Sequence, residues 1–143
     1  AGAQATGYQA GAQATGDQAG AQATGYQAGA QATGYQAGAQ ATGDQSGAQA
    51  TGKWAVSSAI GDNSSATIQS PENEKISEGC AISLGIDGKA KGQIGCWLTL
   101  AEWERDKRDN WHRINIKTKR IDGEKIKENT WYRLVNGKFT QEK

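Results

Sequence analysis

The sequence predicts an all-β fold, a parallel β-solenoid (β-roll or β-helix) of nine-residue repeats followed by a small antiparallel β cap. Three observations predict it. A nine-residue unit repeats from the first residue, small residues recur at alternate places within the unit, and turn dipeptides separate short strand-like runs in the second half. We place the solenoid in residues 1–92, with irregular last coils and an insertion near 70–78, and a Trp-rich β-meander cap in residues 93–143.

The repeat is the primary evidence for the solenoid. Six regular units, of the form AGAQATGYQ with substitutions in the eighth and ninth places and, in the sixth unit, also in the first, begin at Ala1, Ala10, Ala19, Ala28, Ala37 and Ser46. A seventh unit from Ala55 keeps the glycine at its seventh place, and an eighth begins at Ser64 before the pattern breaks at Pro71. Composition alone is typical of a disordered low-complexity segment. The degenerate seventh unit argues against disorder, because Ala55, Ser57 and Ala59 stay small while their neighbours vary.

Alternate places of the unit are predicted to face opposite sides of a strand. The first, third and fifth places face inward, and the second, fourth and sixth face outward; in the first unit these are Ala1, Ala3, Ala5 and Gly2, Gln4, Thr6. Gly7 permits the turn at positive φ, which leaves Tyr8 at an exposed corner. A coil of two repeats and a coil of three repeats both fit the period. We favour two, because alanine methyl groups fill only a thin gap between flat sheets.

Apolar residues appear at outward places where the repeat degenerates. If the strand register holds through the segment after Gly79, these residues are Val56, Ile60, Ile82 and Leu84. An apolar outer patch beside a polar one predicts burial under the cap or under another subunit.

The second half is rich in strand formers and hairpin signals. Runs at 96–104, 111–119 and 131–135 are expected to be strands, and Asp122-Gly123 and Asn136-Gly137 are expected to be hairpin turns. The two cysteines, Cys80 and Cys96, are either bridged or buried as free thiols, and we favour free thiols. There is no run of about 18 apolar residues, so no membrane helix and no membrane partner are expected. The chain has no Met and opens inside a repeat, and we expect it to be a fragment or a processed product.

No catalytic pattern is present, and we expect neither an enzyme nor a cofactor. His112, the one histidine, lies in a charge-rich turn with Glu102, Glu104, Asp106 and Asp109, where a solvated turn is favoured over a general base. Two cysteines and one histidine are too few for zinc. The corner residues Asp17, Asp44, Asp62 and Asn63 are candidate calcium ligands only in partnership with neighbouring coils, since calcium needs six or more oxygen ligands.

Two further surfaces have weaker signals. Basic residues lie among tryptophans between Trp103 and Arg120, but interspersed acids favour a mixed-charge face, so nucleic acid is not an expected partner. The regular outward threonines suit an exposed strand, and they also allow an ice- or mineral-ordering face on the Thr/Gln side.

The repeats with their glycine turns, together with the stretch CAISLGIDGKAKG, resemble the parallel β-rolls in the heads of trimeric autotransporter adhesins and haemagglutinin-type repeats. The ending GCWLTLAEW…DGEKIKENTWYRLVNGKF resembles the C-terminal regions of uncharacterised bacterial and bacteriophage repeat proteins. The Gly-Gly-x-Gly-x-Asp pattern of calcium-binding toxin repeats is missing. The resemblance covers the whole chain loosely and implies a surface, fibre or phage-associated scaffold.

These observations predict a structural or interaction rod, in which a repeat spacer is closed by a cap that docks a protein partner or another copy of the chain. The alternatives are a binding module for a host protein or glycan, and the ice- or mineral-ordering surface. An extracellular, cell-surface or phage-associated localisation is favoured. The residues expected at the interaction surface of the cap are Trp103, Trp111, Arg105, Arg108 and Tyr132.

Overall fold

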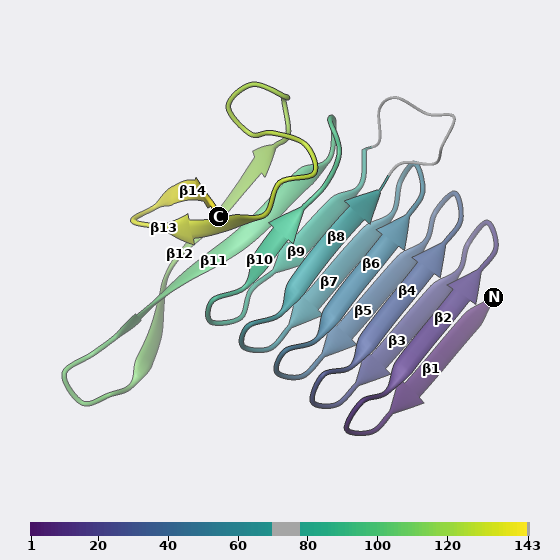
Figure 1. The fold of residues 1–143 in the computed structure, drawn as a ribbon, viewed down its shortest axis with the longest axis horizontal. Helices are drawn as coiled ribbons and strands as arrows, with labels where there is room; N and C mark the ends of the chain where they lie inside the picture. Colours follow the sequence, from purple (N-terminus) through teal and green to yellow (C-terminus); the bar gives the residue numbers. More distant parts are fainter. Residues whose placement is uncertain (70–77, 143) are drawn as a thin grey trace.

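Two seven-stranded sheets lie face to face and form a flattened solenoid (Figure 1). The computed structural model describes residues 1–69 and 78–142. Sheet A has the strand order β1-β3-β5-β7-β9-β11-β12, and sheet B has the order β14-β13-β10-β8-β6-β4-β2. The chain therefore crosses from one sheet to the other after each strand from β1 to β10, and the N-terminus and the β13–β14 hairpin lie at opposite ends (Figure 1). The described residues contain no helix, and hence none that could span a membrane.

The strands of the regular coils begin nine residues apart. Their bounds are β1 Gly2–Thr6, β2 Gly11–Thr15, β3 Gly20–Thr24, β4 Gly29–Thr33, β5 Gly38–Thr42, β6 Gly47–Thr51, β7 Val56–Ile60 and β8 Ser65–Gln69. The C-terminal strands are β9 Cys80–Ser83, β10 Lys89–Lys91, β11 Trp97–Arg105, β12 Trp111–Arg120, β13 Tyr132–Val135 and β14 Lys138–Gln141.

One coil contains two repeats, so the preference for two repeats over three is confirmed. Gly2 pairs with Gly20 in sheet A, and Gly11 pairs with Gly29 in sheet B, each in parallel register. The predicted facing is also confirmed, because the alanines of β3 and β4 are at most 4% exposed while their glutamines are exposed. The core of the rod is a double layer of alanine methyl groups, as the repeat predicted.

Glycine forms the corners because the coils approach one another closely there. Gly25 has φ +145°, and a Cβ atom at this position would lie 1.7 Å from the carbonyl oxygen of Gly7 in the neighbouring coil. The exposed residues beside these glycines stack along the rod. The rings of Tyr8 and Tyr26 lie 5.1 Å apart, and the Gln9 amide donates to Gln27 over 3.0 Å. Stacking of equivalent residues in adjacent coils therefore stabilises the corners as well as the sheets.

The C-terminal strands form two hairpins and not the single meander that we predicted. In β11, residues 97–100 pair in parallel with β9, so the ladder of sheet A continues past residue 93, and β12 then returns antiparallel to β11. The β13–β14 hairpin extends sheet B through the pairing of Tyr132 with Ala90. Each hairpin thus adds to a different sheet.

Only one of the two predicted turn dipeptides makes a hairpin. Asn136 and Gly137 have φ values of 51° and 71° and connect β13 to β14, as expected for a two-residue turn of the I′ type. The Asp122-Gly123 prediction is wrong. The Asp122 carboxylate instead accepts hydrogen bonds from the N–H groups of residues 124–126 and closes a local turn, and these bonds, that of Ile126 first, lower its pKa.

The core changes from small to large side chains at the C-terminal end. Ile68 occupies the inward place that Ala50 holds in the preceding coil, and it is fully buried. The large buried residues that fill this end of the solenoid are Leu98, Leu100, Ile121, Ile126, Tyr132 and Leu134. The cap therefore closes the rod with an internal apolar plug, and not by covering the outer face, which was one of the two alternatives for the apolar outer residues.

Candidate interaction surfaces

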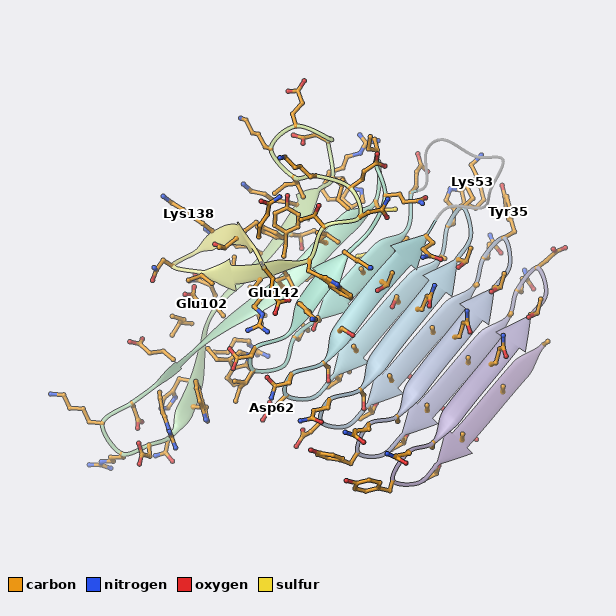
Figure 2. The ribbon with its side chains drawn as sticks, viewed as in Figure 1. Tyr35, Lys53, Asp62, Glu102, Lys138 and Glu142 are labelled. Atoms are coloured by element: carbon orange, nitrogen blue, oxygen red, sulfur yellow. The ribbon has the colours of Figure 1, made fainter. Side chains whose placement is uncertain are left out.

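The Glu102 carboxylate joins the two hairpins of the cap (Figure 2). It accepts hydrogen bonds from the backbone N–H groups of Asn136 and Gly137 at the tip of the β13–β14 hairpin, and from the Asn115 amide on β12 over 2.8 Å. Lys117 completes the contact by donating to the Gly137 carbonyl over 2.7 Å. The Asn115 hydrogen bond, followed by the backbone donors and Lys117, lowers the pKa of Glu102 below its ordinary value of 4.5. We call these groups the Glu102 clasp.

Replacing Glu102 by Gln should lower the free energy of unfolding by about 1 kcal/mol, because an acceptor oxygen and a solvent-screened charge are lost. Since the pKa of Glu102 is lowered in the folded state, its contribution is present above pH 4.5 and is lost as the pH falls through the folded-state pKa. Urea unfolding of the wild type and the variant at pH 7 and pH 3 measures the difference. Glu104→Gln is the matched control, because Glu104 is exposed on the same strand. Equal effects of the two substitutions would contradict the clasp.

Two of the predicted surface tryptophans lie on the β11–β12 ribbon, each against an arginine. The Arg113 guanidinium lies 5.6 Å from the ring centre of Trp103, and Arg105 lies 5.6 Å from that of Trp111. Trp103 is half-buried and donates to the Leu84 carbonyl over 3.0 Å, whereas Trp111 is 44% exposed. The ribbon therefore holds both indoles in place by contacts typical of cation–π pairs.

The tip of the ribbon is ordered by one carboxylate. Asp106 accepts from the N–H groups of Arg108 and Asn110 and contacts the His112 ring at 2.7 Å. The backbone hydrogen bond of Asn110, followed by the side-chain hydrogen bond of His112, lowers the pKa of Asp106. The predicted surface residue Arg108 thus lies in an exposed turn, and His112 serves there as a partner of Asp106.

A small pocket of about 220 Å³ lies where the ribbon passes the last corner of the solenoid. Trp103 and Trp111 are among the residues that line it, and Arg133 and Asp87 contribute polar groups. The Arg133 guanidinium donates a hydrogen bond to the Glu142 carboxylate over 2.9 Å (Figure 2 labels Glu142). The Nε atom of Arg133 is buried without a hydrogen-bond partner among the described residues. Aromatic walls with a few polar groups are typical of ligand sites.

Tyr132 does not belong to the surface, and this prediction is wrong. Its side chain is 2% exposed, because the residue pairs with the inward-facing Ala90. The Tyr132 hydroxyl accepts from the Lys127 N–H over 2.7 Å, which satisfies its polar end. Tyr132 is part of the internal plug.

The four residues predicted at an apolar outer patch do lie at outward places. Val56 and Ile60 are both 44% exposed, whereas Ile82 and Leu84 are half-buried. Two of the four contact the cap: Ile82 pairs with Thr99 of β11, and the Leu84 carbonyl accepts from Trp103. The cap does not cover Val56 or Ile60, because it extends the sheets instead of folding over them. The alternative, that another subunit covers these two residues, stays a prediction.

The corner acids serve a structural role where they are hydrogen-bonded. Asp44 accepts from the Asp62 N–H, and Asp62 accepts from the Ile86 N–H (Figure 2 labels Asp62). Among residues 1–69 and 78–142, no three His, Cys, Asp or Glu side chains are grouped as metal ligands would be. The two cysteines are free, and burial raises the pKa of the Cys80 thiol.

Sequence reasoning missed a second aromatic–cation cluster on sheet B. The ammonium groups of Lys89 and Lys91 lie 4.8 and 4.6 Å from the ring centre of Trp131, and Lys89 also pairs with Glu142 at 3.2 Å. Lys89 and Lys91 occupy outward places on the same strand, and this alternation was the available signal. Their nearness to Trp131 depends on the long-range pairing of β10 with β13.

No protein-family model, no curated protein and no solved structure matches this chain.

Proposed function

We propose that the chain is a non-enzymatic structural rod, a solenoid spacer that its C-terminal cap closes and that docks a partner or another copy of itself. The observation that carries the proposal is the contrast between the two parts of the rod. The strands of the regular coils present the same side chains coil after coil, so the number of coils changes the length of the rod and little else. The C-terminal end is irregular, apolar inside and closed on both sheets.

At the C-terminal end of the rod, both sheets finish in strands that oppose further pairing. The edge of sheet A is β12, which carries the exposed cations Arg113, Lys117, Lys119 and Arg120. The edge of sheet B is β14, which is only four residues long. Charged or short edge strands prevent the unwanted growth of sheets, which supports the role of the cap as a terminator.

The pocket between Trp103, Trp111 and Arg133 supports the alternative, in which the cap is a binding module for a protein or a glycan. We prefer the spacer, because a binding module with a pocket of this size would not need the series of interchangeable coils that makes up the first half of the chain.

Insertion of whole coils tests the spacer. Two additional copies of the segment 10–27 should give a soluble, folded protein whose melting temperature equals or exceeds that of the parent, since each coil adds one more set of neighbour contacts. Insertion of the partial repeat AGAQA at the same point is the control. It should destabilise the protein, because an odd number of added residues breaks the period and shifts inward alanines outward. If the insertion of whole coils unfolds the chain, or if both insertions are equally tolerated, the interchangeable-coil account is wrong.

A further inference from the structure

The outer faces of the two sheets are alike in the first coils and diverge in the later ones. Both begin with glycine, glutamine and threonine at the three outward places of each strand. At the corresponding places of later strands sheet A has Val56, Ser58, Ile60, Cys80, Ile82, Trp97 and Thr99, whereas sheet B has Ser65, Thr67, Gln69, Lys89 and Lys91. The later strands of sheet A thus present a more apolar outer face than those of sheet B. Selective loss of polar groups from one face indicates that this face is covered.

The outer face of sheet A is hollow at one end and raised at the other. Its first row of outward residues, read across the strands, is Gly2, Gly20, Gly38, Val56, Cys80, Trp97 and Arg120. The glycine half of this row is the floor of a groove of about 700 Å³ that ends at Val56 and Ser58. The other half carries Trp97, which is 42% exposed.

We infer that the partner of this face is a second copy of the chain, packed sheet A against sheet A. We place a two-fold axis between the two copies, parallel to β7, the middle strand of the sheet. Rotation about this axis puts each row of outward residues opposite the same row of the second copy, but it reverses the order of the strands along that row. Trp97 then lies over Gly20 of the second copy, and Val56 meets Val56 of the second copy. The largest side chain of the row lies on the part that has no side chains, so the face is complementary to itself.

Charge supports a second copy over a charged partner. The outward residues of β1, β3, β5, β7 and β9 and of the segment 97–101 include no ionisable acid or base other than the Cys80 thiol. The cations of this face are on β12, and the two-fold axis places Arg120 over the uncharged β1 of the second copy. Among these outward strand residues the arrangement therefore brings no like charges together, and they offer no counter-charge to a highly charged partner.

The area of the face is sufficient for a dimer of modest strength. Seven strands about 4.8 Å apart, each about five residues long at 3.3 Å per residue, give a face of about 34 by 17 Å. Two copies would bury about 1,100 Å² of flat area, near the lower limit for specific interfaces. The inference specifies the docking part of the proposed function. If the dimer were disproved, the proposal of a capped rod would be unaffected, because coil insertion tests that proposal separately.

Analytical ultracentrifugation of the intact chain at up to about 100 μM should show a dimer. Val56→Lys should weaken the dimer at least about tenfold, because it places two ammonium groups opposite one another at the axis. Ser65→Lys is the matched control, since residue 65 is the equivalent outward place of sheet B, and it should leave the dimer unchanged. Circular dichroism confirms that both variants are folded. A monomeric wild type, a trimer, or equal effects of the two substitutions would overturn the inference.

Thiol cross-linking tests the position of the axis. In a Cys80→Ser background, which removes the thiol on the neighbouring strand, Val56→Cys should form a covalent dimer with a short bismaleimide, which spans the about 10 Å between packed sheets that a disulfide does not. Ser65→Cys in the same background should not do so. Equal cross-linking of the two variants would exclude the proposed axis.

Discussion

Removal of residues 93–143 is expected to leave a chain that aggregates or does not fold. The deletion takes away the large side chains of the plug and leaves Ile68 without its packing partners. Each large apolar side chain contributes about 1.5–3 kcal/mol on burial, against about 0.8 kcal/mol for an alanine methyl group. The deletion also exposes β9 and β10 as parallel edges open to pairing with other chains. Solubility, sedimentation and far-UV circular dichroism of the truncated chain measure the effect.

Deletion of residues 10–27 is the control for this truncation. It removes one coil and joins Gln9 to Ala28, which continues the repeat in phase. The product should remain soluble and rich in β-structure. If instead the chain without residues 93–143 is soluble, monomeric and β-rich, the cap does not close the rod, and its primary role must be sought elsewhere.

Gly25→Ala is expected to destabilise the rod by several kcal/mol, far more than Gly7→Ala. Both glycines have positive φ, 145° and 151°, so the backbone strain that alanine adds is similar. Their surroundings differ, because a Cβ at residue 25 would lie 1.7 Å from the Gly7 oxygen, whereas one at residue 7 has its nearest neighbour at 4.0 Å. The chain cannot relieve the first contact without separating two coils.

The difference between these two variants isolates the coil contact from the backbone conformation. Thermal unfolding of both proteins measures it. Melting temperatures lowered by the same amount would mean that the corners do not approach as closely as the stacked coils require.

The repeat was predictable because its structure is local and periodic. Strand direction, the inward place of the alanines and the corner glycines all follow from a period of nine and an alternation of two. The Asn136-Gly137 turn was also predictable, because the strands that it joins are adjacent in sequence. The preference for two repeats per coil rested on the size of the methyl group, and the thin alanine core agrees with it.

The errors fall where pairing is between distant residues. Tyr132 was assigned to the surface because its facing is set by Ala90 on the distant strand β10, and no periodicity connects the two. Asp122-Gly123 has the composition of a hairpin turn, but the carboxylate of Asp122 binds the next backbone N–H groups and closes a local turn instead. Glu102 was considered only as a possible neighbour of His112, because its true partners in the β13–β14 turn are far from it along the chain.

Small-angle X-ray scattering of coil-insertion variants tests most directly whether the chain is a capped spacer. The measurement is best made in the Val56→Lys background, so that self-association does not add to the length. If each inserted pair of repeats forms one coil, two inserted coils lengthen the particle by about 10 Å, because parallel strands stack about 4.8 Å apart. A disordered insertion of the same length would instead add a segment with an end-to-end distance of about 30–35 Å. The smaller increase is the predicted result, and the larger one, or no increase at all, would contradict the account.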